Sequence, residues 1–320
     1  MRSPCLVAGM LTACTHAPME PVVPPSGARA DGAEARLSAT IVHLADTLGE
    51  RNIQAHPDAL RATADHIEVT LRAQGHTPRR QVVPTPFGDT TNVVVTIPGA
   101  TSDLFVIGAH YDTAPGTPGA DDNASGVAAL LELARRLEGA QPPWTLELVA
   151  WTNEEPPWFR REQMGSVHHA ADLAARQDRG DVRVVGVWSL ETIGYYDDTK
   201  GSQQYLGPMG LVYPSEGNYL GFIGNRASKP LVHDSHAAFQ STGALPTEKA
   251  SLPGWITGVD WSDHRSYWPH GMQAVMVTDT ALFRNPHYHE PSDRPETLDV
   301  TRLAGAVDGL EGALWTMMSR

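Results

Sequence analysis

The sequence has 320 residues, of which 41% are hydrophobic and 19% are charged, and its formal net charge is −13 at pH 7. These proportions are ordinary for a soluble globular protein, and the length suffices for one large α/β domain or two small ones. The negative charge argues against nucleic acid and anionic lipid surfaces as partners, because both are polyanions. It is compatible with an acidic pocket that holds cations.

The first residues have the pattern of an export signal. Arg2 precedes a short apolar stretch that ends in LTAC at residues 11–14. This is typical of a secretory signal with a bacterial lipobox, in which Cys14 becomes the lipidated first residue of the mature chain. The alternatives are a plain signal peptide cleaved nearby and a misplaced start codon. Residues 15–35 are rich in Pro, Gly and Ala and predict a flexible linker. We therefore expect an exported, periplasmic or cell-envelope protein with a lipid anchor at Cys14.

From residue 36 onward, helical and strand patterns alternate. In chain order the sequence predicts helices at 37–52 and 57–75, strands at 79–87, 91–99 and 103–112, a helix at 126–139, a strand at 144–155, a helix at 167–177, a strand at 182–196, a helix at 231–243, a strand at 272–280 and a helix at 300–318. The rest of 197–262 is rich in Gly, Pro and Ser and is expected to form loops. The alternation predicts one domain over 36–320, with three α/β/α layers and a mixed, mostly parallel sheet.

Side chains that can bind metals are concentrated where the predicted strands end. They are His110, Asp112, Asp121, Asp122, Glu154, Glu155, Glu191, His287 and His289. Alternate residues of a strand share a face, so His110 and Asp112 point together; Asp112 could fix the imidazole tautomer or bind the metal directly. Glu154 and Glu155 point to opposite sides if the chain is still extended, so one could bind metal while the other acts as a general base on a bound water.

Imidazoles and several carboxylates without a thiolate suit Zn²⁺ or another borderline divalent ion at a catalytic centre. Each segment alone has an ordinary alternative. A single histidine is more often a surface or core residue, paired acids are usually solvated, and Asp121 and Asp122 could cap the helix that follows them. The prediction of a metal centre therefore depends on all of these segments falling at strand ends.

Six motifs in order resemble a known family. GAHYD, GADDNASG, WTNEE, SLETIG, SDHRSYW and NPHYHEPSDRPETLD together are similar to the di-zinc exopeptidases of metallopeptidase family twenty-eight, which include bacterial leucyl-type aminopeptidases. The resemblance spans roughly residues 36–320 in motif order and in spacing. It implies the zinc-exopeptidase fold and a metallo-aminopeptidase that uses two Zn²⁺ ions to hydrolyse N-terminal residues from peptides.

The resemblance also implies a role for each residue of the site. Asp122, three positions before the Ser-Gly of its motif, would bridge both metals and be joined to Asn123 by a cis peptide bond, whereas Asp121 would be a neighbour without a metal bond. Two cations would supply the countercharge for a buried bridging carboxylate. The other metal ligands would be His110 and Glu191 on one ion, and Glu155 and His289 on the other.

The remaining roles concern proton transfer and orientation. By resemblance, Glu154 would be the general base, which takes a proton from the metal-bridging water and passes it to the leaving amine, and Asp112 would orient His110. Some relatives carry a disulfide-closed loop with a tyrosine just before their Ser-Asp-His sequence, but residues 258–261 contain no cysteine. Asp263 and His264 are therefore expected to line the site without an assigned role.

Other functions are open on the same scaffold. A glutaminyl cyclase uses one zinc ion and retains some of the same ligands. A peptidase-like ectodomain without catalysis would be a binding module, but such proteins typically lose metal ligands, and here every ligand position holds a competent residue. The sequence has neither the G-x-S-x-G elbow of serine hydrolases nor an HExxH helix, which argues against those two classes.

Overall fold

The computed structural model describes residues 31–320. The predicted signal at 1–14, its Cys14 and the linker up to residue 30 lie outside the described residues. The first helix, α1 (Ala33–Val42), begins three residues before the predicted domain start, because Ala33, Leu37 and Ile41 form one buried stripe at helical spacing. Within residues 31–320, no helix combines the length and the apolar content needed to cross a bilayer.

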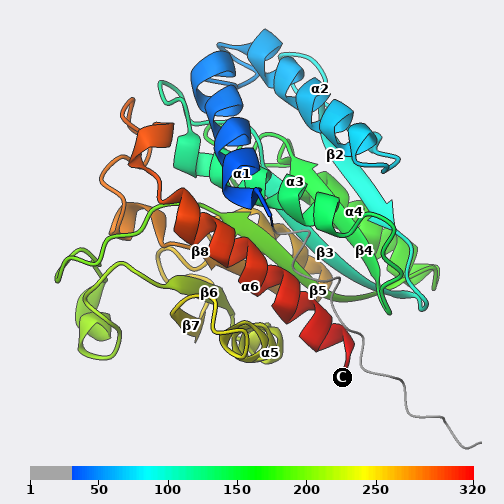
Figure 1. Ribbon diagram of the computed structural model, residues 1–320. Helices are drawn as coiled ribbons and strands as arrows, with labels where there is room; N and C mark the ends of the chain where they lie inside the picture. Colours follow the sequence, from blue (N-terminus) through cyan, green and yellow to red (C-terminus); the bar gives the residue numbers. More distant parts are fainter. Residues whose placement is uncertain (1–30) are drawn as a thin grey trace, which may run out of the picture.

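A single eight-stranded sheet forms the centre of the molecule (Figure 1). Its strands are β1 (Arg79–Val83), β2 (Thr90–Ile97), β3 (Asp103–His110), β4 (Thr145–Trp151), β5 (Arg183–Glu191), β6 (Leu220–Asn225), β7 (Thr247–Leu252) and β8 (Ala274–Thr278). They lie in the order β1-β2-β4-β3-β5-β8-β6-β7. Four neighbouring pairs are parallel (β3 with β4, β3 with β5, β5 with β8, β6 with β7), and β1–β2, β2–β4 and β6–β8 are antiparallel. The predicted mixed, mostly parallel sheet is confirmed.

Two strands, β6 and β7, lie where the sequence predicted loops. In β6, Gly221 and Gly224 lower the strand propensity and interrupt the apolar alternation. In β7, which forms one edge of the sheet, all six residues are half-buried, so its sequence TEKASL has no apolar face. β6 is therefore stabilised by pairing with β8 and β7, and β7 by pairing with β6, which local sequence does not show.

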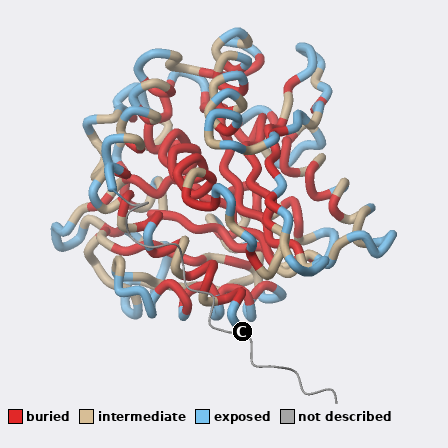
Figure 2. Tube along the Cα trace, turned by 45° about the vertical axis from the view of Figure 1, so that its right-hand side comes forward, coloured by how far each residue is buried: buried red, intermediate tan, exposed pale blue. Residues whose placement is uncertain are grey.

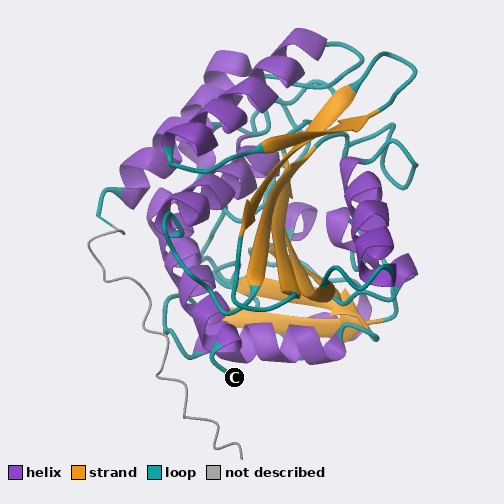
Figure 3. Ribbon diagram, turned by 90° about the vertical axis from the view of Figure 1, so that its right-hand side faces the viewer, coloured by secondary structure: helices purple, strands orange, loops and turns teal. Residues whose placement is uncertain are grey.

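Helices cover both faces of the sheet (Figure 3). On one face, α2 (Pro57–Ala73), α3 (Gly126–Arg136) and α5 (Lys229–Gln240) pack against the strands, and α1 and α6 (Val300–Met318) pack against α3 and each other. The opposite face carries α4 (Gly165–Asp178) and the short 3₁₀ helix η5 (Asp263–His270). The sheet itself is buried between these layers (Figure 2).

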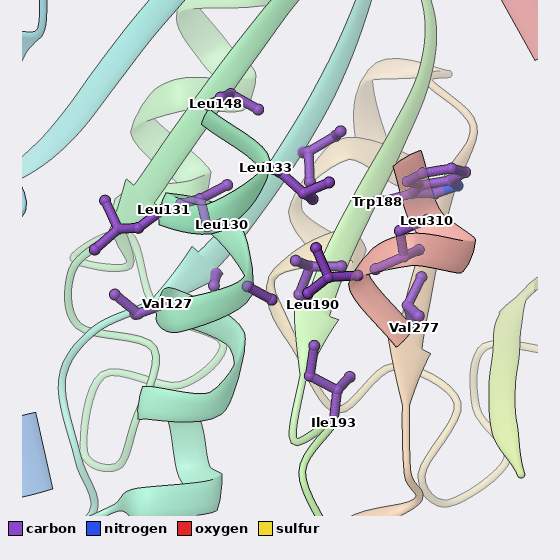
Figure 4. Close-up of a cluster of buried hydrophobic side chains, with 14 of the residues drawn as sticks. Val127, Leu130, Leu131, Leu133, Leu148, Trp188, Leu190, Ile193, Val277 and Leu310 are labelled. Atoms are coloured by element: carbon purple, nitrogen blue, oxygen red, sulfur yellow. The ribbon is translucent and has the colours of Figure 1, made fainter. Parts of the chain in front are cut away.

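The central strands alternate between two hydrophobic cores. In β3, Phe105 and Ile107 belong to the core under α3, while Leu104 and Val106 belong to the core under α4. Figure 4 shows part of the first core, to which Leu130 of α3, Leu190 of β5 and Leu310 of α6 all contribute. Burial on both faces explains the continuous apolar runs of these strands. It also leaves the polar residues at the strand ends as the ones available for a site.

The carboxyl ends of β3, β5 and β8 lie along the same rim of the sheet, the rim where these strands end, because the three strands are parallel neighbours. The segments that follow β5 (yellow-green) and β8 (orange) project from the same side of the molecule (Figure 1). In open α/β sheets, ligands bind at the carboxyl ends of the strands. The fold therefore brings the predicted site residues to one edge.

Candidate metal centre

The five predicted metal ligands converge around Asp122. His110 ends β3, Glu191 ends β5, and Asp122 lies in the turn η3 (Ala120–Ser125) before α3. His110 Nε2 lies 3.2 Å from Asp122 Oδ1 and 3.3 Å from Glu191 Oε2. His289 Nε2 lies 3.0 Å from Asp122 Oδ2 and 3.3 Å from Glu155 Oε2. One carboxylate thus lies between two groups, each with an imidazole and a second carboxylate.

These atoms are well placed to hold two cations. His110 Nε2, both Asp122 oxygens, Glu155 Oε1 and His289 Nε2 are buried but make no hydrogen bond, so their lone pairs are available to a metal ion. Two ligands of a tetrahedral Zn²⁺, with bonds of about 2.1 Å, lie roughly 3.4 Å apart. The separations of 3.0–3.3 Å are close to this value. The residues therefore fit a pair of borderline divalent ions that share Asp122.

The charges at this centre are also those of a site suited to cations. Burial, together with the neighbouring Asp122 carboxylate, raises the pKa of Glu155 to about 8. Burial alone would lower the pKa of His289, but the Asp122 and Glu155 carboxylates raise it to about 11. Without metal, a protonated imidazole thus supplies the countercharge. A metal ion would take over this role and release the proton, since imidazole binds metal in its neutral form.

Asp112 links the His110 side of the centre to the Glu154–Glu155 side. Its carboxylate accepts hydrogen bonds from the backbone N–H groups of Glu154, at 3.0 Å, and Glu155, at 3.1 Å. Its backbone carbonyl lies 3.2 Å from His110 Nδ1, closer than its carboxylate at 3.6 Å. The contact with the imidazole that the sequence suggested for the carboxylate is therefore made mainly by the carbonyl.

The chain is no longer extended at Glu154 and Glu155. The strand predicted for 144–155 ends at Trp151, because Asn153 adopts a φ of 60° and turns the chain. The condition under which the two glutamates would point to opposite sides, a chain still extended, is therefore not met. The turn, held by Asp112, places an oxygen of each glutamate within 4.8 Å of a His110 nitrogen.

Asp112→Asn should weaken metal binding while the protein stays folded. Asparagine keeps one acceptor oxygen, so one of the two backbone N–H groups in the 154–155 turn loses its partner and the turn loosens. Changes of this kind to groups that orient ligands typically cost about 10–100-fold in metal affinity or activity. Zinc titration against a competing chelator measures the effect, with thermal unfolding as the check on folding. An unchanged zinc affinity would contradict the role assigned to Asp112.

The structure separates the two adjacent acids Asp121 and Asp122. The Asp121 carboxylate accepts hydrogen bonds from the Gly194 N–H, at 2.9 Å, and from Asn285 Nδ2, at 2.8 Å, so it is turned away from the histidines. The peptide bond from Asp122 to Asn123 is cis, as the resemblance implied. Asp121 is a structural neighbour in this arrangement.

Of the two candidate histidines in the 285–290 segment, His287 and His289, only one reaches the metal centre. His287 Nδ1 lies 2.9 Å from Ser292 Oγ at the exposed side of the loop, whereas His289 reaches Asp122. The ring of Tyr288 stacks on that of His289, with centroids 3.9 Å apart. The predicted ligand, His289, is therefore the one that the structure brings to the centre.

Sequence reasoning gave no role to four residues of the motifs around the centre, and two of them, Asp293 and Ser262, contact it. Asp293 accepts hydrogen bonds from the N–H groups of Asp121, at 2.8 Å, and Asp122, at 3.1 Å. Ser262 Oγ donates to Glu191 Oε2 at 2.7 Å. Asp263 and His264, expected to line the site, are fully buried, and burial raises the pKa of Asp263 to about 7. The available signal was that all four lie within the motifs PSDRP and SDH.

A further supporting residue, Arg51, had no signal in the sequence. Its buried guanidinium donates from Nε to the carbonyl of Tyr111 at 2.8 Å, from Nη1 to that of Pro118 at 2.6 Å, and from Nη2 to that of Gly119 at 2.9 Å. Arg51 thus fixes both ends of the loop between β3 and the Asp122 turn. Burial lowers its pKa to about 10, so it stays cationic at neutral pH beside the acidic centre.

With this geometry in hand, comparison with known proteins identifies the family. The family model described as Peptidase family M28 matches residues 92–310. The chain belongs to peptidase family M28. This M28 member is 39% identical over 284 residues to the uncharacterized protein YfbL of Escherichia coli (strain K12), an alignment that covers 86% of the chain and 85% of the relative.

Other relatives of this M28 member have named activities. It is 25% identical over 221 residues to aminopeptidase YwaD of Bacillus subtilis (strain 168), covering 68% of the chain and 42% of the relative, so it spans less than half of that protein. The solved structure of a zinc aminopeptidase from Bacillus subtilis matches with a TM-score of 0.69 at 15% identity, covering 88% of this chain and 94% of that one. The glutaminyl cyclase of Fimbriiglobus ruber matches with a TM-score of 0.65 at 18% identity, covering 89% and 95%. These structures confirm the predicted zinc-exopeptidase type of α/β fold.

Proposed function

We propose that this M28 member is a zinc-dependent aminopeptidase, which hydrolyses N-terminal residues from peptides with two Zn²⁺ ions. The observation that carries the proposal is the position of Asp122 between the His110–Glu191 pair and the His289–Glu155 pair. A relative with 25% identity is named an aminopeptidase, which supports the same activity.

The residues around the centre suggest how the reaction proceeds. When bound, the metal ions would polarise the substrate carbonyl and make a water molecule acidic at neutral pH. Glu154 is buried beside His110 and Glu155 but is not needed for either ligand group around Asp122. It is therefore free to accept a proton from the attacking water and to deliver it to the nitrogen of the leaving amine. Asp112 holds Glu154 in this place through the backbone.

Metal content and turnover together test this proposal. We expect two zinc ions per chain, hydrolysis of aminoacyl anilides, and loss of that hydrolysis after chelation, with recovery when zinc is returned. The likeness to a glutaminyl cyclase structure makes cyclisation the second candidate. One zinc ion per chain together with ammonia release from an N-terminal glutamine peptide would favour it. Bound zinc without turnover of either substrate would favour a non-catalytic ectodomain.

We also propose that the protein is exported to the periplasm or cell envelope and is held at the membrane only through a lipid on Cys14, with peptides as its partners and no nucleic acid. The proposal is supported by the LTAC sequence at 11–14 and the Pro-rich stretch that follows it. Mass spectrometry of the mature N-terminus in a bacterial host tests it. An unmodified N-terminus, or retention in the cytosol, would overturn it.

A further inference from the structure

A pocket opens directly beside the metal centre. Glu191 and Tyr288 line one end of it, and its walls come from β6, β7, β8, the segment after β5 and residues 252–261. Three tyrosines, Tyr205, Tyr213 and Tyr219, contribute to its wall. A peptide whose first carbonyl lies at the metal centre would therefore place its N-terminal side chain in this pocket.

One row of residues across the sheet forms the floor of the pocket. Glu191 of β5 pairs with Thr278 of β8, Thr278 pairs with Gly221 of β6, and Gly221 pairs with Glu248 of β7. Residues paired in this way point to the same face of a sheet. Glu248 thus lies on the same face as the predicted metal ligand Glu191, three interstrand spacings of about 4.8 Å away, or roughly 14 Å between Cα atoms.

The middle of this row is open because it holds a glycine. A Cβ at Gly221 would lie 3.3 Å from the Thr278 carbonyl oxygen and 3.7 Å from Thr278 Cγ2, over the path from Glu191 to Glu248. With no side chain at Gly221, a long substrate side chain can lie along the floor. The pocket is thus extended toward Glu248.

Glu248 is the charged group of the pocket that remains available, although the positive charge of the neighbouring Lys249 acts on its carboxylate. Among the described residues that line the pocket, the charged ones are Glu191, Glu248 and Lys249. Glu191 belongs to the metal centre. Lys249 alternates to the opposite face of β7, where its Nζ lies 3.2 Å from His236 Nδ1 of α5. No hydrogen bond or ion pair within residues 31–320 holds the half-buried Glu248 carboxylate.

The tyrosine wall, formed by Tyr205, Tyr213 and Tyr219, lies within electrostatic range of the Glu248 carboxylate. Burial and then the negative charge of Glu248 raise the pKa of Tyr213. The rings of Tyr205 and Tyr213 stack with centroids 5.8 Å apart, and Tyr205 Oη lies 2.9 Å from Tyr219 Oη, so the wall is held in place. Aromatic faces beside a carboxylate form an environment that attracts a cation.

We propose that Glu248 makes this pocket select substrates whose N-terminal residue is lysine or arginine; this inference rests on the proposed aminopeptidase function. The methylene stem of such a side chain would pack along the apolar and aromatic walls, and its cationic end would pair with the Glu248 carboxylate. An uncharged side chain such as norleucine fills the same space but leaves the carboxylate desolvated and unpaired, which a site selects against.

Lysine and norleucine anilides give the sharpest test, because the two side chains have similar length and differ in charge. For the zinc-loaded protein we expect kcat/KM to be at least about tenfold higher for the lysine anilide. Glu248→Gln should lower this ratio about tenfold, while kcat/KM for norleucine stays within about twofold. As a matched control, Glu34→Gln removes one negative charge from the exposed first turn of α1 and should leave the ratio unchanged. A wild-type preference for norleucine, or a ratio insensitive to Glu248→Gln, would overturn the proposal.

A binding measurement separates this inference from the aminopeptidase proposal itself. Calorimetry on the zinc-loaded protein compares free L-lysine with free L-norleucine, and requires no turnover. We expect tighter binding of lysine in the wild type and in Glu34→Gln, and loss of that preference in Glu248→Gln. Lysine preference without anilide hydrolysis would refute the proposed function but keep the role of Glu248. Hydrolysis of the anilides without a lysine preference in either measurement would keep the proposed aminopeptidase function and refute the role of Glu248.

Discussion

Glu154→Gln should lower kcat about 10²–10⁴-fold while two zinc ions stay bound. Glutamine has nearly the same shape as glutamate and can keep the hydrogen bonds of the backbone around it, but it cannot accept the proton of the attacking water. The Asp112 carboxylate would still hold the backbone N–H groups of residues 154 and 155. The two ligand groups that share Asp122 contain Glu155 but not Glu154, so the substitution would leave all of their side chains in place.

The measurement combines steady-state hydrolysis of an aminoacyl anilide with metal analysis of the same preparation. Glu155→Gln provides the comparison on the adjacent side chain. Because Glu155 Oε2 lies 3.3 Å from His289 Nε2, its replacement should lower zinc content together with activity. Loss of zinc from Glu154→Gln would reassign Glu154 as a ligand, and near-normal turnover with two zinc ions would exclude it as the base.

The sequence predicted the parts of the fold and the centre that have a local signal. The central strands are recognisable because residues such as Leu104 and Phe105 are buried on opposite faces, which produces an unbroken apolar run. His110 and Glu191 were predicted because each stands where such a run stops. Parallel strands then bring the two residues to the same edge, so the strand pattern alone implied that they are close.

The features that escaped prediction depend on contacts between distant segments. Arg51 contacts backbone carbonyls of the 111–119 loop and lies in no motif. Asp293 lies within the PSDRP motif, but its contact with the backbone N–H groups of the Asp122 turn is set by the fold. The place of Glu248 follows from the pairing of β6 and β7, two strands with little strand-like pattern. A residue's role in such cases is set by the register of the sheet, which the sequence around it does not contain.

Asp122→Ala should abolish tight binding of at least one zinc ion and reduce hydrolysis to background. The substitution removes the carboxylate whose two oxygens lie 3.2 Å from His110 Nε2 and 3.0 Å from His289 Nε2, so each metal site would lose a ligand and the shared negative charge. Zinc content after dialysis against a weak chelator measures the loss, and thermal unfolding shows whether the variant is folded.

The adjacent acid provides the control for that experiment. Asp121→Asn loses one of two acceptor contacts, with the Gly194 N–H or with Asn285 Nδ2, and should reduce stability by roughly 1–3 kcal/mol. It should keep both zinc ions, because the Asp121 carboxylate is turned away from the histidines. Two tightly bound ions in Asp122→Ala would refute the bridging assignment. Zinc loss from a folded Asp121→Asn, together with normal zinc in Asp122→Ala, would make Asp121 the bridging ligand. That outcome would contradict the structure, in which the Asp121 carboxylate is hydrogen-bonded to the Gly194 N–H and to Asn285 Nδ2.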